Sequence, residues 1–302
     1  MERVSAASFP ARVTVASLAA LALLTSCSTS PADQARTAER QYLAIGDSYA
    51  AGYRPALDGG EAENTTDGFA WKVAEKTGLG LVNVSCSGIT TVAFVEGDPC
   101  DEDLRAPGAL APVKGSEAAV ALDHLDRHAD DVELVTVVLG ANDLRACSFD
   151  AAWRRCVAET MPRVTRALDS LLSGLRERLG PDVPIVGLTY PDIWLGAPVR
   201  QPKSAEARRV AQASVEAFRT AVNPALRRTY AAHGATFVDV TDAFGAYLPA
   251  DRTIRTSKFG TIPVRAARVC AETYACSLGD AHPTPEGHQR IADLVLESLE
   301  GQ

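Results

Sequence analysis

Four short motifs, spread over most of the chain, carry the side chains that acyl transfer to water requires. They are Gly46-Asp47-Ser48, Ser85-Cys86-Ser87-Gly88, Gly140-Ala141-Asn142-Asp143 and Gly279-Asp280-Ala281-His282-Pro283. A serine hydroxyl can attack a carbonyl carbon, an imidazole can accept the proton of that hydroxyl, and backbone or side-chain N–H groups can stabilise the oxyanion. This inventory predicts a nucleophilic Ser48 with His282 as its general base.

The first motif has a purely structural interpretation as well. Asp and Ser are common helix caps, so Asp47-Ser48 alone would more often mark only the start of a helix. The other three motifs favour chemistry. We expect Ser48 to lie between a strand and a helix, where the helix N-terminus would add positive potential for an oxyanion.

The elements that would position these motifs alternate between strand and helix patterns. Apolar runs predict five buried strands, and amphipathic runs predict five helices; the strands are 42–45, 81–85, 134–139, 184–188 and 236–240, and the helices about 69–76, 117–128, 151–179, 205–232 and 285–299. Alternation of this kind predicts an α/β fold, a three-layer α/β/α sandwich with a five-stranded parallel sheet in one domain. Ligands bind such sheets at the carboxyl ends of the strands, where the motifs fall.

Residues 249–279 are long for a connection and carry two cysteines, Cys270 and Cys276. Long loops are commonly functional or disordered, and cysteine pairing favours a functional loop.

Size and charge narrow the class of protein. The chain has 302 residues, of which 46% are apolar, enough for a sizeable core. Its formal net charge is −8, with no block of like charge, which argues against nucleic acid as a partner.

Residues 1–27 have the pattern of an export signal. Arg3 and Arg12 precede an apolar run, 13–24, that is too short to span a membrane stably. The run ends in Leu-Thr-Ser-Cys at 24–27, which resembles the lipobox of bacterial lipoproteins and makes Cys27 the expected lipidation site. An ordinary secretory signal is the alternative. We therefore expect an exported protein, at the extracellular face of the membrane or secreted, with a polar tether over 28–40 and a catalytic domain over 41–302.

Six cysteines remain if Cys27 carries lipid, an even number for an oxidising compartment. Fifteen pairings are possible, but the spacing groups them as Cys86 with Cys100, Cys147 with Cys156 and Cys270 with Cys276. A metal cluster is the competing interpretation; with no CxxC spacing and five scattered histidines, we expect no metal.

The motifs together resemble the blocks of the SGNH (GDSL-type) hydrolase family. The stretch GDSYAAG at 46–52 resembles the first block, Gly88 the second, Gly140-Ala141-Asn142-Asp143 the third and His282-Pro283 the fifth, in the family's order, and the resemblance extends over 42–299. It implies a flavodoxin-like SGNH hydrolase fold. The three cysteine pairs are similar to those of secreted actinobacterial esterases and lipases in this family.

The resemblance also implies roles. Ser48 would be the nucleophile, His282 the general base and then general acid, and the oxyanion hole would consist of the N–H groups of Ser48 and Gly88 with the amide of Asn142. The fifth block departs from the usual Asp-x-x-His, because here Asp280 precedes His282 by two residues. Either Asp280 orients the imidazole, or a main-chain carbonyl within 278–280 does so and leaves a Ser-His dyad.

These observations predict a serine hydrolase that cleaves a carboxylic ester, lipase-like or esterase-like, as a monomer without a cofactor. Two alternatives stay open: a glycan O-deacetylase, and an inert lipoprotein that only binds lipid or glycan. Among the remaining candidates, we expect Trp194 to line the substrate pocket, Asp143 to fix the Asn142 loop, and His288 to be a surface or packing residue.

Overall fold

A computed structural model describes residues 40–57, 59–110, 115–147, 149 and 152–301, and every structural statement below refers to this part of the chain. The expected export signal at 1–27, Cys27 and the tether up to residue 39 lie outside the described residues. The strands are β1 (Gln41–Gly46), β2 (Tyr53–Arg54), β3 (Glu63–Asn64), β4 (Gly80–Ser85), β5 (Val132–Val138), β6 (Ile185–Leu188), β7 (Thr236–Val238), β8 (Thr253–Thr256) and β9 (Gly260–Pro263). The α-helices are α2 (Phe69–Thr77), α3 (Thr91–Glu96), α4 (Glu117–His128), α5 (Ala141–Leu144), α6 (Trp153–Leu179), α7 (Ala197–Arg200), α8 (Ala205–Ala217), α9 (Asn223–Ala232), α10 (Val240–Ala243), α11 (Val264–Glu272) and α12 (Pro285–Glu300).

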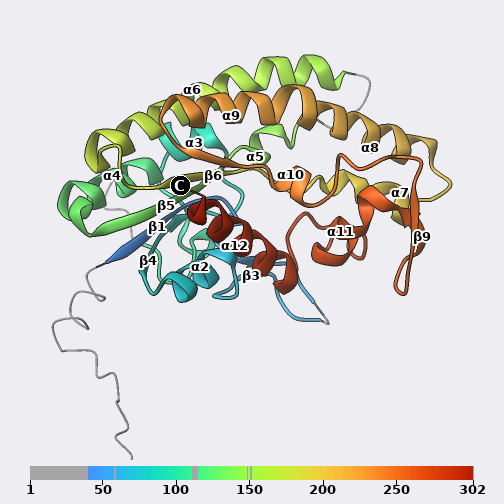
Figure 1. Cartoon of the computed structure of the whole chain (residues 1–302), viewed down its shortest axis with the longest axis horizontal. Coiled ribbons are helices and arrows are strands. Elements are labelled where there is room, and N and C mark those ends of the chain that lie inside the picture. The colour runs from blue at the N-terminus through green and yellow to red at the C-terminus, as the bar shows by residue number, and fades with distance from the viewer. Residues whose placement is uncertain (1–39, 58, 111–114, 148, 150–151, 302) are drawn as a thin grey trace, which may run out of the picture.

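Five parallel strands form the central sheet, in the order β4-β1-β5-β6-β7. The predicted parallel five-stranded α/β fold is therefore confirmed. The strands alternate their side chains between two helical layers, one with α3, α4, α6 and α9 and the other with α2, α11 and α12 (Figure 1). In β1, for example, Leu43 and Ile45 belong to the first core, whereas Tyr42 and Ala44 belong to the second.

The predicted helix over 205–232 is interrupted. It consists of α8, a π-helical turn from Phe218 to Val222 and α9. Pro224 at the start of α9 has no N–H to donate to the preceding turn, and the wider turn accommodates this loss. Other boundaries differ by one or two residues; for instance, β5 begins at Val132, and the run predicted as a strand to Val240 ends at Val238.

Residues 249–279 were expected to form a long loop, and this expectation is wrong. This segment folds into an antiparallel hairpin of β8 and β9 and then into α11, which buries Ala266, Val269 and Cys270. The strands are four residues each, too short and too exposed for a clear alternating pattern in the sequence.

None of the helices in the described ranges combines the length and apolar character that crossing a membrane requires. The longest, α6, is amphipathic: Leu168, Leu171, Leu172 and Leu175 are buried, while several arginines face solvent.

Candidate active site

Ser48 lies in a tight turn directly after β1. The turn is closed by hydrogen bonds from the N–H of Ala51 to the Asp47 carbonyl and from the N–H of Tyr53 to the Ser48 carbonyl, at 2.9 and 3.0 Å. Gly46 is required at the strand end because a Cβ there would stand 2.6 Å from Cγ1 of Val138. The expected helix after Ser48 is absent, since residues 48–52 form turns that lead into β2, so no helix N-terminus supports this serine.

A continuous hydrogen-bonded chain joins Ser48, His282 and Asp280. Nε2 of His282 is 2.8 Å from Oγ of Ser48, and Nδ1 of His282 is 2.8 Å from Oδ1 of Asp280. The carboxylate can only accept, so Nδ1 carries the proton and Nε2 is left to accept that of Ser48. Burial opposes ionisation of Asp280, but the hydrogen bonds and charge of His282 outweigh it and hold the pKa of this carboxyl below its usual value. Of the two alternatives for orienting His282, the geometry favours the Asp280 carboxylate.

Tyr49, within the GDSYAAG stretch, and Tyr53, directly after it, flank the imidazole of His282. The ring of Tyr53, at the start of β2, is 4.2 Å from it, and that of Tyr49 is 5.9 Å away, centroid to centroid. The hydroxyl of Tyr49 donates a 2.6 Å hydrogen bond to the carbonyl of Ala281. No sequence pattern indicated a role for these two tyrosines, and only their proximity to Ser48 in the chain could have suggested a part in the site.

Gly88 follows β4 in a loop that is held from several sides. Its φ of +84° is in the left-handed region, which glycine adopts without strain. Within the described chain, the backbone N–H groups of Ser48 and Gly88 have no hydrogen-bond acceptor, so both are free to donate to a bound molecule. The N–H of Cys86 donates to the Gly46 carbonyl at 3.1 Å, which joins the Gly88 loop to the turn of Ser48.

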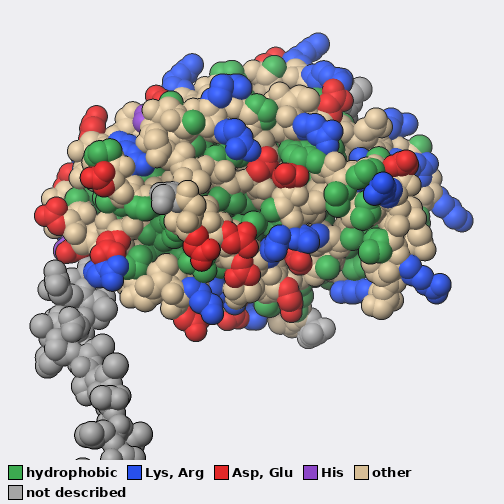
Figure 2. All heavy atoms as spheres, viewed as in Figure 1, with side chains coloured by type: hydrophobic (Ala, Val, Ile, Leu, Met, Phe, Trp, Pro, Cys, Tyr) green, Lys and Arg blue, Asp and Glu red, His purple; other side chains and the backbone are tan. Residues whose placement is uncertain are grey.

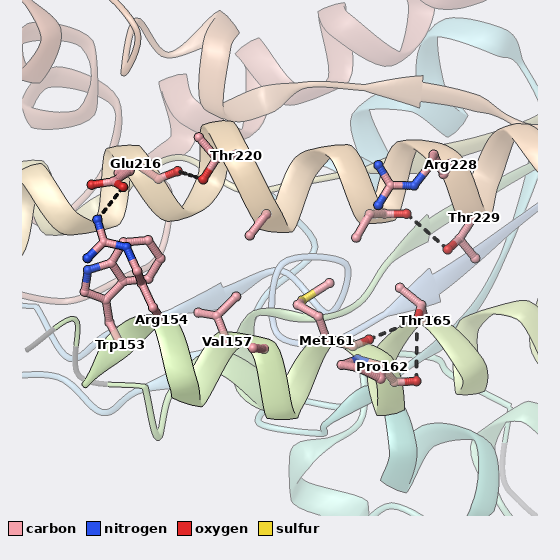
Figure 3. A pocket seen from close by; sticks show the side chains of 13 residues that line it. Trp153, Arg154, Val157, Met161, Pro162, Thr165, Glu216, Thr220, Arg228 and Thr229 are labelled. Carbon is pink, nitrogen blue, oxygen red and sulfur yellow. Dashed lines mark hydrogen bonds and ion pairs between the residues drawn. The ribbon is translucent and has the colours of Figure 1, made fainter. Parts of the chain in front are cut away.

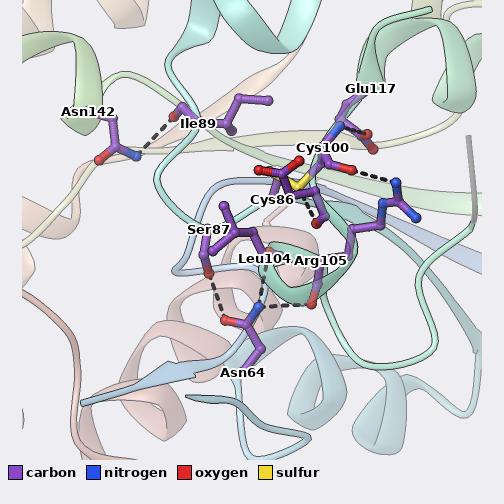
Figure 4. The surroundings of a disulfide bond; sticks show 10 residues. Asn64, Cys86, Ser87, Ile89, Cys100, Leu104, Arg105, Glu117 and Asn142 are labelled. Atoms are coloured by element: carbon purple, nitrogen blue, oxygen red, sulfur yellow. Dashed lines mark hydrogen bonds between the residues drawn. A yellow bond between two sulfur atoms is a disulfide. The ribbon is translucent and has the colours of Figure 1, made fainter. Parts of the chain in front are cut away.

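Asn64 of β3 connects the Gly88 loop to its surroundings, as Figure 4 shows. Its Oδ1 accepts from the Ser87 hydroxyl at 2.6 Å, and its Nδ2 donates to the carbonyls of Leu104 and Arg105 at 3.0 and 2.8 Å. The disulfide between Cys86 and Cys100 closes the same loop. Asn64 therefore holds the Gly88 loop in place, and no sequence pattern indicated this role.

Asn142 lies on α5, the short helix that follows β5 in the chain. Its Nδ2 donates to the Ile89 carbonyl at 2.9 Å and lies 3.4 Å from Oδ2 of Asp47 (Figure 4 shows the first contact). Asp143, the next residue, accepts from the N–H and the hydroxyl of Thr91 at 2.8 and 2.9 Å, which ties this loop to α3. The amide is thereby held between the first and second motifs.

Asp47 is buried beneath this arrangement. Its Oδ1 accepts from the N–H of Tyr49 at 3.0 Å, and its Oδ2 accepts from the hydroxyl of Tyr190 at 2.7 Å. Burial raises the pKa of Asp47 to about 6, although the hydrogen bonds from Tyr190 and Tyr49 act against the shift. The Asp47 carboxylate thus stabilises the turn of Ser48 through buried hydrogen bonds. The sequence did not indicate Tyr190 as one of its partners.

Three disulfides join the six cysteines in the pairs that the spacing suggested: Cys86–Cys100, Cys147–Cys156 and Cys270–Cys276. Each pair has one member within six residues of a candidate site residue in sequence, since Cys86 precedes Gly88, Cys147 follows Asn142 and Cys276 precedes His282. Each disulfide therefore ties down a chain segment that adjoins a candidate site residue in the sequence, and Cys156 and Cys270 lie in α6 and α11.

Other candidate residues have packing roles. His288 on α12 is buried, and its Nδ1 accepts from the N–H of Phe69 at the start of α2, at 3.2 Å. Burial lowers the pKa of His288 to about 3, so it is neutral in the folded protein. Trp194 is partly buried and packs against the first core, with its ring 4.4 and 6.2 Å from those of Phe149 and Phe218, centroid to centroid. Its expected place in the wall of the substrate pocket stays a prediction.

A groove of about 630 Å³ lies between α6 and the helices η4 (Phe218–Val222) and α9 (Figure 3). Its floor includes Val157 and Met161, and an ion pair between Arg154 and Glu216 stands at one end. None of the four motifs lines it, so we assign it no part in the chemistry at Ser48.

The arrangement provides an activated hydroxyl, an oriented base and free N–H donors at one edge of the sheet. Within the described ranges, no group of three histidines, cysteines or carboxylates could hold a metal ion. The side chains that are present can carry out acyl transfer through a serine ester.

The match to a protein family agrees with this chemistry. Residues 44–290 match the GDSL-like lipase/acylhydrolase family. The chain is 27% identical to lipase 2 of Streptomyces coelicolor over 325 residues, which cover 95% of both chains. A similar solved structure is an extracellular lipase from Streptomyces rimosus, with 18% identity, a TM-score of 0.49 and coverage of 86% of this chain and 99% of that one. Another is a carbohydrate acetylesterase family member from Sinorhizobium meliloti, with 14% identity, a TM-score of 0.44 and coverage of 85% and 95%.

Proposed function

Because the chain belongs to the GDSL-like lipase/acylhydrolase family and is a carboxylic ester hydrolase, we propose that it cleaves acyl esters through a covalent intermediate on Ser48. The observation that carries this proposal is the hydrogen-bonded chain from Ser48 through His282 to Asp280, with both distances to the imidazole at 2.8 Å. This is the geometry in which a base can take the serine proton as the hydroxyl attacks.

The reaction would proceed in two halves. In the first, the Ser48 oxygen bonds to the ester carbonyl carbon, and its proton passes to Nε2 of His282 and then to the departing alcohol. In the second, His282 takes a proton from water, whose oxygen bonds to the acyl carbon; the bond from that carbon to Ser48 then breaks, Nε2 returns the proton to Oγ, and the acid leaves. In both halves the oxyanion would accept from the free N–H groups of Ser48 and Gly88, and from the amide of Asn142 once it gives up its 3.4 Å contact with Asp47. Asp280 would keep Nδ1 protonated and stabilise the imidazolium.

For the substrate we propose an acyl ester of lipid type. The support is the similarity to lipase 2 of Streptomyces coelicolor over 95% of the chain. The acyl chain of such an ester would be buried beside Ser48. Each methylene that leaves water contributes roughly 0.8 kcal/mol, so longer esters should react better.

Hydrolysis of p-nitrophenyl acetate, butyrate, octanoate and palmitate by the purified, disulfide-bonded protein tests this function beside Ser48→Ala. We expect rates that rise with chain length and disappear in the variant. Activity confined to acetate and lost in Ser48→Ala would instead indicate a glycan O-deacetylase. Equal inertness of both proteins on all four esters would contradict the esterase and favour a binding lipoprotein.

We further propose that the protein is exported and anchored by lipid at Cys27, and that it acts as a monomer. The three disulfides support an oxidising compartment, and the Leu-Thr-Ser-Cys sequence at 24–27 supports the anchor. Expression in a bacterial host that processes lipoproteins, beside Cys27→Ser, tests the anchor: the wild type should remain in the membrane fraction and the variant should leave it. Release of both proteins to the same extent would contradict the lipid anchor and indicate a freely secreted enzyme.

A further inference from the structure

Tyr49 connects the nucleophile to the acid–base segment through one side chain. It follows Ser48 directly in the sequence, and the residue is 4% exposed. Its backbone N–H is fixed on Asp47, while its hydroxyl donates to the carbonyl of Ala281, the residue between Asp280 and His282. A single residue therefore bridges two segments that are 232 positions apart.

Within the turn 280–282, Asp280 and His282 are hydrogen-bonded to each other. Oδ1 of Asp280 accepts both from the backbone N–H of His282, at 2.9 Å, and from its Nδ1. These bonds fix the carboxylate against the imidazole, but they do not fix either group relative to Ser48. That relation depends on what holds the turn from outside.

Among the described residues, two hydrogen bonds from outside reach the main-chain carbonyls of this segment. The backbone N–H of Tyr274 donates to the His282 carbonyl at 3.0 Å, and the Tyr49 hydroxyl donates to the Ala281 carbonyl at 2.6 Å. The first comes from Tyr274, in the segment that the disulfide Cys270–Cys276 closes. The second comes from the nucleophile's own turn.

Resting on the proposed function, we propose that Tyr49 is a positioning residue: its hydroxyl, through the Ala281 carbonyl, holds the Asp280–His282 pair at hydrogen-bond distance from Ser48. The two-residue spacing of this pair makes the Ala281 carbonyl its midpoint, so one hydrogen bond there locates both side chains. Burial, together with the charges of Asp47 and Asp280, raises the pKa of Tyr49 well above its usual value, so its hydroxyl remains a donor wherever the enzyme is folded.

Tyr49→Phe removes one oxygen and tests the proposal. We expect kcat on p-nitrophenyl butyrate to fall about tenfold or more with KM changed less than twofold, because misplacing a catalytic group affects the transition state and leaves substrate binding alone. The matched control is Tyr230→Phe, which removes another buried hydroxyl that donates to a main-chain carbonyl, that of Val137 at 3.2 Å. The control should lose a similar amount of thermal stability and keep its kcat.

A double-substitution cycle separates positioning from a general loss of stability. In an Asp280→Ala background no ordered pair remains, so Tyr49→Phe should lower kcat by less than a further twofold. Rates are expressed per serine that reacts with a fluorophosphonate probe, which counts only competent sites and corrects for any unfolded fraction.

Each outcome bears on one claim. A wild-type kcat for Tyr49→Phe, or an equal fold-loss in both backgrounds, overturns the positioning role and leaves the proposed function standing. A wild-type protein that neither hydrolyses the ester series nor reacts with the fluorophosphonate overturns the proposed function itself, and the positioning role with it.

Discussion

Oδ1 of Asp280 accepts two hydrogen bonds from the same residue, from the backbone N–H of His282 at 2.9 Å and from its Nδ1 at 2.8 Å. The backbone bond bends the chain so that a carboxylate only two positions upstream reaches the imidazole of its neighbour. An extended segment could not do this, because side chains at i and i+2 would lie about 7 Å apart along the strand. The shortened spacing is therefore compatible with a Ser-His-Asp arrangement.

Asp280→Ala should lower kcat about 100-fold or more with little change in KM, because the imidazolium would lose its charged partner. Steady-state kinetics on p-nitrophenyl butyrate measure this. Asp131→Asn is the matched control, since it removes a carboxylate that pairs with another histidine, His128, at 3.2 Å on the far end of α4. If Asp280→Ala retained the kcat of the control, a main-chain carbonyl would have to orient His282.

Gly88→Ala should reduce kcat roughly tenfold to 100-fold, since an alanine must leave the φ of +84° and would turn the free N–H away. No atom lies within 4 Å of the added methyl, so the effect would come from the backbone alone. Gly78→Ala is the matched control, because Gly78 caps the end of α2 and is not a site residue. It has a similar φ of +70° and open space for a methyl group. Both variants should lose about 1 kcal/mol of unfolding free energy, and only Gly88→Ala should lose activity.

Reduction of the disulfides should inactivate the enzyme before it unfolds. The links close segments of 14, 9 and 6 residues that lie near Gly88, Asn142 and His282 in the sequence, so breaking them loosens these segments, whereas the hydrogen bonds of the parallel sheet remain. A titration with dithiothreitol, followed by activity and by far-UV circular dichroism, should show activity falling first. Coincident curves would indicate that the disulfides hold the fold as a whole.

The protein should lose stability in acid through His288. Its pKa is lowered from 6.5 to about 3 in the folded state, so between these values the unfolded chain binds a proton that the native chain does not. The free energy of unfolding must then fall as pH decreases through this window, by up to about 1.4 kcal/mol per pH unit from this group.

His288→Gln checks that sign. At pH 7 the variant should be less stable, because the buried acceptor of the Phe69 N–H is perturbed. Urea unfolding at pH 7, 6 and 5 should show the difference between the two proteins shrinking, since only the wild type is destabilised by protonation of this histidine. A constant difference would mean that His288 does not titrate on unfolding in this range.

The amino-acid sequence determined the order of elements and the inventory of the site. The periodicity of apolar residues set the five central strands and most of the helices, because burial of a strand or of one helix face constrains residue type at every turn. Parallel connectivity then brought the motifs of Ser48, Gly88, Asn142 and His282 to one edge, since consecutive right-handed crossovers leave all carboxyl ends on the same side.

Only the tertiary structure decided how those groups are held. The partners of the site residues, Tyr49 on Ala281, Tyr190 on Asp47 and Asn64 on Ser87, are hydrogen bonds between segments far apart in the chain, and a single polar side chain in a sequence carries no sign of its partner. The turn that replaces the expected helix after Ser48, and the hairpin and helix within 249–279, likewise depend on packing against the rest of the molecule. Residue type fixed what chemistry was available, and long-range contacts fixed its geometry.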